Sequence, residues 1–414
     1  NTVLHLPALT HLAQKNAHNV KVKIYLKLVS LVLRLVNPYG VAKIASSLLI
    51  TLNVFRVIIM KKLHSLPVKH IERGTSKSVI VTLGLKGELK SLFQFRAGQY
   101  VTIQHEFDGE SLRRCYSICT PEGSEDLKIG VKEVDGGAFS AFANQNLKVG
   151  DMLDVLPPSG NFTLPLKDNS SHMLGVAAGS GITPVISHVE TFLSKNLNSK
   201  VTLIYGNKTP ASIMFRERIE DLKNTFLERL TVVHVLSSTQ QEIDLFSGRI
   251  TSEKLEGILN IWGAGHKIDC AFLCGPEMMV RDIKSKLEIM GVSKQKIFYE
   301  LFTSTKRKKQ NTVKTINPNL KQTTAIVILD GVAHKVSLNS NQSLLDAARE
   351  SNLDAPYSCL GGICSSCRCK IVEGSGEMEV NHSLEDYEVQ AGFALSCQLR
   401  PTSETITITY DEIH

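Results

Sequence analysis

CLGGICSSC, residues 359–367, places three cysteines in one short loop, and a fourth follows at Cys397. The spacing Cys-x4-Cys-x2-Cys, with twenty-nine residues before the last cysteine, is the one used by plant-type [2Fe–2S] sites. Iron in such a cluster takes four soft thiolate ligands, and Gly361 and Gly362 let backbone amides approach the sulfurs. The sequence therefore predicts a [2Fe–2S] cluster whose ligands are Cys359, Cys364, Cys367 and Cys397.

Two other uses of these thiols fit the spacing less well. Zinc sites usually pair two Cys-x2-Cys knuckles, and this segment has one such pair. A disulfide framework is typical of secreted proteins, whereas the chain has nine cysteines, an odd number. We therefore expect a cytoplasmic, reducing setting, with Cys369, which does not fit the spacing, as a packing residue.

The chain is too long for one ordinary hydrophobic core, because it has 414 residues. Its composition is globular, with 43% apolar and 21% charged residues. The net charge of +7 is concentrated in the first sixty-odd residues and in Lys306–Lys309. This distribution does not indicate a nucleic-acid-binding face, and two to four domains are expected.

Residues 1–60 form an apolar extension with scattered basic residues. Val41–Met60 most resembles a membrane span, but Lys43 and Arg56 leave only twelve uncharged residues between them, fewer than the roughly 20 that a bilayer requires. Three interpretations remain open: an amphipathic helix pair at a membrane surface or a partner protein, a poor transmembrane helix, or an extension upstream of a functional start at Met60. Contact with the inner face of the membrane is thus an alternative to a purely cytoplasmic location.

From residue 61 to residue 167, short β-rich runs alternate with glycines. The runs are 79–83, 100–103, 127–131 and 152–155. Several short strands at this spacing predict a small antiparallel β-barrel.

Residues 168–302 instead alternate between strands and helices. Apolar strands are expected at 173–178, 201–205, 230–236 and 271–274, and helices at 184–193, 215–224 and 277–290. This alternation is typical of an α/β domain with a doubly wound parallel sheet.

Residues 303–322 are polar and lysine-rich and are interpreted as a linker. In residues 323–414, two strands at 325–329 and 334–338 flank Asp330-Gly331, which is a strong hairpin signal. A helix is expected over 343–352 with Ser343 or Asn341 as its N-cap, and a last strand over 405–410. The C-terminal segment is therefore predicted to be a small α+β domain that contains the cysteine loop.

Two motifs in the barrel segment are suited to a flavin nucleotide. In Arg114-Cys115-Tyr116-Ser117 the guanidinium can neutralise a diphosphate, the phenol ring can lie against an aromatic ring system, and the hydroxyl can hydrogen-bond its edge. The turn at Gly136–Ser140 leads into a helix, and a helix N-terminus offers free N–H groups to phosphate.

Two motifs in the α/β segment are suited to a second nucleotide. Gly179-Ser180-Gly181-Ile182-Thr183-Pro184 follows a strand and opens a helix, and Cys274-Gly275-Pro276 lies at the end of another strand. Ligands of parallel sheets bind in the crevice beyond the carboxyl ends of the strands.

The order R-x-Y-S, G-G-x-x-S, G-x-G-I-T-P and C-G-P resembles the ferredoxin–NADP reductase superfamily. With the C-terminal cysteine loop, the chain looks most like the reductase subunits of multicomponent epoxidases that act on phenylacetyl-CoA. The resemblance covers residues 61–414 and implies an FAD-binding barrel, an NAD(P)-binding α/β domain and a β-grasp [2Fe–2S] ferredoxin domain. It does not cover residues 1–60.

The resemblance also implies roles for individual residues. FAD would be held by Arg114, Tyr116, Ser117, Val131, Lys132, Gly137 and Ser140. The nicotinamide nucleotide would be held by Gly179, Gly181, Thr183, Tyr205, Gly206, Asn207, Cys274, Gly275 and Pro276. The residues expected closest to the chemistry are Thr183, Cys274 and Glu300, although Cys274 also suits a buried packing residue and Glu300 a solvated acid at a strand end.

This cofactor set predicts an oxidoreductase that passes electrons from NAD(P)H through FAD to the cluster and then to a partner protein. A hydride carries two electrons and a cluster accepts one, and a flavin can handle both. Lys208, Ser237, Ser238 and Arg249 are candidates to bind an adenosine 2′-phosphate, and the resemblance favours NADPH.

The partner that accepts single electrons is expected to be a soluble diiron oxygenase of phenylacetate catabolism. An alternative is a membrane fatty-acid desaturase or hydroxylase. A third possibility is a sensor or scaffold in which the cluster has only a structural role.

Overall fold

The computed structural model describes residues 62–164, 171–195, 197–262, 267–302, 322–339 and 342–411. The predictions for residues 1–60 and for nearly all of the linker lie outside these residues. Within them, no helix is both long and apolar enough to cross a bilayer.

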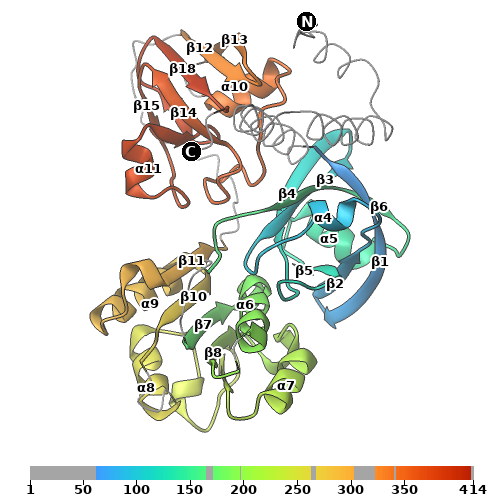
Figure 1. Ribbon diagram of the computed structural model, residues 1–414, viewed down its shortest axis with the longest axis vertical. Helices are drawn as coiled ribbons and strands as arrows, with labels where there is room; N and C mark the ends of the chain where they lie inside the picture. The colour runs from blue at the N-terminus through green and yellow to red at the C-terminus, as the bar shows by residue number, and fades with distance from the viewer. Residues whose placement is uncertain are drawn as a thin grey trace, which may run out of the picture. The chain divides into compact units, whose positions relative to one another are not determined.

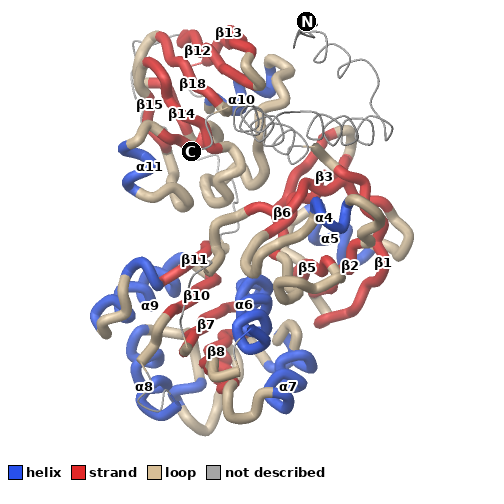
Figure 2. The backbone as a smooth tube through the Cα atoms, viewed as in Figure 1, coloured by secondary structure: helices blue, strands red, loops and turns tan. Residues whose placement is uncertain are grey.

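The first described segment folds as a six-stranded antiparallel sheet with the strand order β4-β3-β6-β1-β2-β5. A bridge between Ile118 and Ile129 joins its two edges, so the sheet closes as a barrel. Two short helices accompany the strands (Figure 2). The elements are β1 (His64–Thr75), β2 (Ser78–Leu83), α4 (Leu89–Leu92), β3 (Tyr100–Phe107), β4 (Glu110–Ser117), β5 (Leu127–Lys132), α5 (Ala138–Gln145) and β6 (Met152–Ser159).

Alternation along the strands separates the barrel core from its outer face. On β3, Val101 and Ile103 lie in the barrel core, whereas Tyr100 and Thr102 do not belong to it. Successive strand side chains point to opposite faces, so Tyr100 and Thr102 lie on the outside of the barrel.

The α/β domain has a five-stranded parallel sheet with the order β11-β10-β7-β8-β9. One face carries α6 and α7 and the other carries α8 and α9 (Figure 1). The strands are β7 (His172–Ala178), β8 (Lys200–Asn207), β9 (Leu230–Leu236), β10 (Cys270–Gly275) and β11 (Ile297–Leu301). The helices are η1 (Gly179–Gly181), α6 (Ile182–Lys195), η2 (Pro210–Ser212), α7 (Arg216–Thr225), η3 (Asp244–Phe246), α8 (Ser252–Trp262), α9 (Glu277–Ile289) and η4 (Lys294–Lys296).

The C-terminal domain has a mixed five-stranded sheet, β13-β12-β18-β14-β16, and a two-stranded sheet, β15-β17. The predicted hairpin is present, with Asp330 and Gly331 both at positive φ in its turn. The elements are β12 (Gln322–Leu329), β13 (Val332–Asn339), α10 (Leu344–Glu350), β14 (Arg368–Glu373), β15 (Gly376–Met378), α11 (Asp386–Gln390), β16 (Phe393–Leu395), β17 (Leu399–Pro401) and β18 (Thr405–Thr409).

Two expectations within this domain are decided by the structure. The helix begins after Ser343, whose hydroxyl accepts a hydrogen bond from the Asp346 amide at 3.1 Å, so Ser343 is its N-cap. Cys369 is fully buried in the domain core and its thiol donates to the Ala394 carbonyl, as expected of a packing residue.

Candidate active site

One cavity of about 1720 Å³ brings together motifs from all three segments of the chain. Its lining includes most of the predicted site residues and two of the predicted cluster ligands, Cys359 and Cys364. The predicted residues that line it are Arg114, Tyr116, Ser117, Lys132, Gly137, Ser140, Gly179, Thr183, Gly206, Asn207, Gly275, Pro276 and Glu300. Val131, Gly181, Tyr205 and Cys274 are not among the lining residues.

The R-x-Y-S motif, residues 114–117, forms the C-terminal end of β4, where it pairs with residues 100–103 of β3. Arg114 is exposed toward the cavity, which suits a side chain that meets a diphosphate. The Tyr116 ring packs against Phe139 with the ring centroids 5.4 Å apart, and burial raises the pKa of its phenol. The phenol therefore stays neutral and presents a fixed aromatic surface.

The Ser140 side chain is hydrogen-bonded to the backbone of the glycine turn that precedes α5. The Ser140 hydroxyl accepts a hydrogen bond from the Val134 amide at 3.2 Å and donates to the Gly137 carbonyl at 3.1 Å. A Cβ at Gly137 would lie 2.5 Å from the Ser140 Oγ, so a larger residue here would displace the Ser140 hydroxyl from these two hydrogen bonds. The α5 N-terminus that results is a suitable site for phosphate.

Lysines gather between the two nucleotide motifs. Lys132 is half-buried, and burial lowers the pKa of its ammonium, with further lowering by Lys208 and Lys77. A nearby like charge disfavours the charged form of a lysine and a nearby anion favours it, so this arrangement suits a bound phosphate. Val131, the preceding residue, instead faces the barrel core and contributes its carbonyl, which accepts a hydrogen bond from Asn144 at 3.2 Å.

The turn between β7 and α6 lies directly against the end of β10. A Cβ placed on Gly181 would be 2.3 Å from the Cys274 carbonyl oxygen. Gly179 has φ +56°, and its carbonyl accepts a hydrogen bond from the Tyr205 hydroxyl at 3.0 Å. Gly181 and Tyr205 therefore shape the crevice from beneath rather than line it.

The side chains predicted closest to the chemistry occupy different environments. The Thr183 hydroxyl donates to the Ser180 carbonyl at 3.0 Å at the start of α6. The Cys274 thiol is fully buried in the core, and burial raises its pKa well above the usual value, with a further contribution from Glu300. Cys274 pairs in register with Glu300 on β11, and its role at the nicotinamide stays a prediction.

Two polar side chains at the cavity have buried atoms without a hydrogen-bond partner in the described part of the chain. These atoms are both amide atoms of Asn207 and the Oε2 of Glu300. Buried polar groups normally find a hydrogen-bond partner. The nucleotides implied by the motifs would supply it, so both residues fit a ligand site.

Burial raises the pKa of the Glu300 carboxyl to about 7, opposed by a hydrogen bond from Ser117 and reinforced by Cys359. The folded state therefore holds this proton more tightly than the unfolded chain, in which a glutamate titrates near ~4.3. The contribution of this proton to the free energy of unfolding is complete at low pH and is lost as the pH rises through 7. Its ceiling is on the order of 3 kcal/mol.

We expect the melting temperature of Glu300→Gln minus that of the unmodified protein to increase from about pH 5 to about pH 8, because the glutamine stays neutral throughout. Thermal melts across this range provide the measurement. Glu350→Gln, at an exposed position, is the control and should show a constant difference. A constant difference for Glu300→Gln as well would contradict the raised pKa.

The four predicted cluster ligands form two pairs. Each thiol shifts the pKa of its neighbour, so Cys359 lies close to Cys364 and Cys367 lies close to Cys397, while Cys364 also lies close to Cys115. Among the described residues no three ligating side chains converge on a single ion position. A two-iron cluster has a pair of protein ligands on each iron, so the pairing fits such a group.

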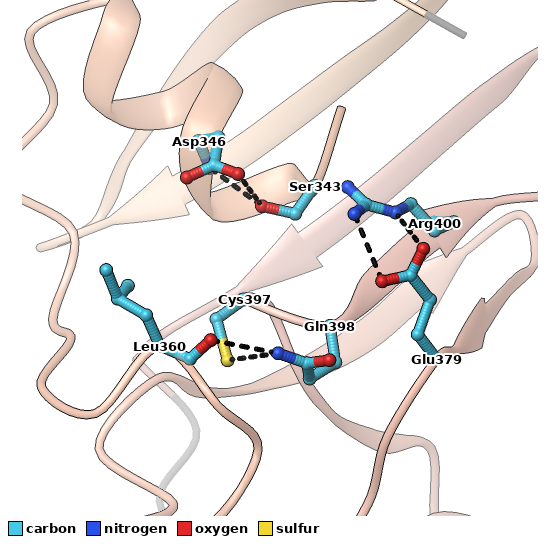
Figure 3. A network of polar contacts seen from close by, with 7 residues as sticks. All are labelled: Ser343, Asp346, Leu360, Glu379, Cys397, Gln398 and Arg400. Atoms are coloured by element: carbon cyan, nitrogen blue, oxygen red, sulfur yellow. Dashed lines mark hydrogen bonds and ion pairs between the residues drawn. The ribbon is translucent and has the colours of Figure 1, made fainter. Parts of the chain in front are cut away.

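Backbone and side-chain donors surround these sulfurs. The amides of Gly361 and Cys359 donate to the sulfurs of Cys359 and Cys364 at 3.4 and 3.3 Å. Gln398 donates to both the Cys397 sulfur at 3.5 Å and the Leu360 carbonyl at 3.1 Å, so it ties the distant cysteine to the loop (Figure 3). Donors to sulfur offset the negative charge of a thiolate cluster.

The chain matches three sequence families in succession. The oxidoreductase FAD-binding domain matches residues 65–164, the oxidoreductase NAD-binding domain matches residues 176–285, and the 2Fe-2S iron-sulfur cluster binding domain matches residues 327–402. The protein is therefore an NAD(P)H-dependent oxidoreductase of the class that combines these three domains, as the order of the motifs predicted.

Similar proteins cover most of the chain. A component of the 1,2-phenylacetyl-CoA epoxidase of Escherichia coli (strain K12) is 37% identical over 85% of this chain and 99% of that protein. A 3-ketosteroid-9-alpha-monooxygenase ferredoxin reductase component of Rhodococcus rhodochrous is 32% identical over 83% of this chain and 96% of that protein. The chain belongs to this family of reductase components of oxygenase systems.

A solved structure shares the fold of the chain. Phthalate dioxygenase reductase, described as a modular structure for electron transfer from pyridine nucleotides to [2Fe-2S], matches with a TM-score of 0.54 and 19% identity, over 84% of this chain and 98% of that one. The predicted multidomain fold is thereby confirmed.

Proposed function

We propose that the chain takes electrons from NADPH and delivers them singly to a diiron oxygenase that epoxidises the CoA thioester of phenylacetate. The observation that carries this proposal is the 37% identity to a phenylacetyl-CoA epoxidase component along 99% of its length. The shared cavity, which reaches from both nucleotide motifs to Cys359 and Cys364, supports the electron path.

The residues of the chain bind and orient, and the cofactors supply the redox chemistry. When bound, FAD accepts a hydride from the nicotinamide and returns its electrons one at a time to the [2Fe–2S] cluster. Arg114 and the α5 N-terminus would hold the FAD diphosphate, and Tyr116 its ring system. Thr183 and the Gly275-Pro276 turn would hold the nicotinamide, and the four paired cysteines the cluster.

The experiment is reconstitution with separately purified oxygenase subunits. NADPH, this protein and the phenylacetyl-CoA epoxidase subunits should together consume oxygen and form the epoxide, whereas omission of this protein should stop both. Efficient electron delivery to a membrane desaturase, with no turnover by the epoxidase subunits, would contradict the proposed partner.

The preference for NADPH rests on the surroundings of Asn207. Lys208, Ser237 and Arg249 line the cavity, and the amides of Ser237 and Ser238 donate to the carbonyls of Asn207 and Lys208, both at 2.8 Å. These bonds hold the ends of two neighbouring strands together beside three exposed polar side chains that suit a 2′-phosphate.

We expect Arg249→Ala to raise the KM for NADPH about tenfold, the effect of one lost charge-assisted hydrogen bond, and to leave the KM for NADH unchanged. Initial rates of ferricyanide reduction with each nucleotide provide the measurement. Arg281→Ala on α9, where Arg281 pairs with Glu277 outside the cavity, is the control. Equal effects on both nucleotides would contradict the preference.

Membrane contact through residues 1–60 is a separate proposal that rests on sequence alone. The basic and apolar composition of this segment suits anionic bilayers. Sedimentation of the full chain with anionic lipid vesicles tests it, and recovery of all the protein in the supernatant would refute it.

A further inference from the structure

The outer face of the β3–β4 ladder is a row of polar and aromatic side chains. Tyr100 pairs with Ser117 and Thr102 pairs with Cys115, and directly opposed residues of an antiparallel pair place their side chains on the same face. Tyr100 and Thr102 are only 4% and 3% exposed, although neither belongs to the barrel core. Another part of the chain must therefore cover this face.

The covering segment is the cluster loop, residues 357–366. The Tyr100 hydroxyl donates to the Cys364 carbonyl at 2.6 Å and lies 3.0 Å from the Ser366 hydroxyl. The Ser358 hydroxyl lies 2.9 Å from the Thr102 hydroxyl and 2.7 Å from the Cys115 sulfur. These contacts join a cluster ligand to the strand pair that carries the R-x-Y-S motif.

The periphery of this contact is weaker than its centre. The Arg113 guanidinium lies 4.5 Å from the centre of the Tyr357 ring, which is a cation–π contact. Its ion pair with Asp354 is 4.0 Å long, and Asp354 is 93% exposed, so solvent screens it. The buried Tyr100 hydroxyl is therefore the contact that fixes the loop at the ligand itself.

We propose that Tyr100 is a positioning residue for electron transfer, whose hydroxyl holds the cluster loop at a fixed separation from the flavin-binding strand β4. The inference rests on the electron path of the proposed function. Each transfer along it moves one electron from the reduced flavin to one ferric iron, which becomes ferrous, and no bond at Tyr100 forms or breaks. Electron-transfer rates fall steeply with separation, so the position of the loop sets the rate.

The test is Tyr100→Phe in the complete holoprotein. The substitution removes one oxygen and keeps the ring, which packs against Gly160. Loss of a buried hydrogen bond should increase the population of the released loop about tenfold. Amide hydrogen exchange across residues 357–366 should accelerate by that factor, and stopped-flow reduction of the cluster should slow, while reduction of the flavin by NADPH keeps its rate.

Two further variants complete the test, one as a control and one at a second contact of the same loop. Tyr387→Phe makes the same chemical change at a residue that is 72% exposed and should leave exchange and both rates unchanged. Thr102→Val keeps the shape of the side chain, removes the bond to Ser358, and should shift exchange and cluster reduction in the same direction as Tyr100→Phe.

Unchanged exchange and unchanged cluster reduction in Tyr100→Phe would overturn the inference. Slowed flavin reduction in that variant would also overturn it, because Tyr100 would then act on the flavin site. The measurement needs no oxygenase, so a wrong partner assignment leaves it intact. Protein purified without flavin or iron would instead refute the proposed function before this test begins.

Discussion

Cys364→Ser is expected to remove the visible absorption of the cluster and to lower NADPH-dependent reduction of cytochrome c by more than about 100-fold. A serine oxygen is a harder ligand than a thiolate and is poorly suited to an iron–sulfur cluster. Cys364 is one of the four residues that would hold the cluster, so its loss would leave three of the four thiolates. Ferricyanide, which can take electrons directly from the flavin, should still be reduced at close to the usual rate.

The matched control is Cys369→Ala. Cys369 lies two residues beyond Cys367 and is buried in the core of the C-terminal domain, outside the ligand spacing. This variant should retain the cluster spectrum and cytochrome c reduction. Retention of an intact cluster in Cys364→Ser would contradict the ligand assignment, and loss of ferricyanide reduction would contradict the separation of the flavin site from the cluster domain.

Gly181→Ala is expected to slow flavin reduction by NADPH by more than about 100-fold, the scale on which misplacement of reacting groups acts. The new Cβ would lie 2.3 Å from the carbonyl oxygen and 2.6 Å from the carbonyl carbon of Cys274. Both atoms belong to the backbone, so the ends of β7 and β10 must move apart. The nucleotide crevice lies between these two ends, and overpacking of this kind also costs about 1–3 kcal/mol of stability.

Stopped-flow reduction of the flavin and thermal melts measure the two effects of Gly181→Ala. The FAD spectrum should persist, since the barrel is not involved. Gly74→Ala, where the nearest atom to a new Cβ is the Ser78 hydroxyl oxygen at 3.1 Å, is the control and should be nearly silent. A normal rate of flavin reduction in Gly181→Ala would show that the two strand ends are not held as the structure has them.

Local patterns were sufficient to predict most of the elements. The alternating apolar runs became β2, β3, β5 and β6, and the strand–loop–helix rhythm became the parallel sheet. The helix predicted over 184–193 begins two residues earlier, at Ile182, because η1 runs directly into α6. Helix α8 and strand β11 were not among the expected elements, although both contain several apolar residues, because their burial depends on neighbours that are distant in sequence.

Some features of the candidate site were also expected from the sequence, and others were not. The lining positions of Arg114 and Thr183 were expected from motifs, because phosphate-binding turns need particular residues at fixed spacing, and that of Asn207 was expected from the family resemblance. Burial of Cys274 was one of two interpretations that the sequence left open, and the raised pKa of Glu300 was not expected, because it results from the desolvation that tertiary packing produces. Tyr100 carries no motif at all, and nothing in its strand distinguishes its hydroxyl from any other.

The sequence by itself determined which cofactors the chain is built to hold, because cysteine spacing and glycine turns are local requirements of iron–sulfur and phosphate chemistry. Only the tertiary structure decided how these sites meet. The contact of Tyr100 with Cys364 spans 264 residues, and a hydrogen bond at that separation depends on how separately folded segments pack together.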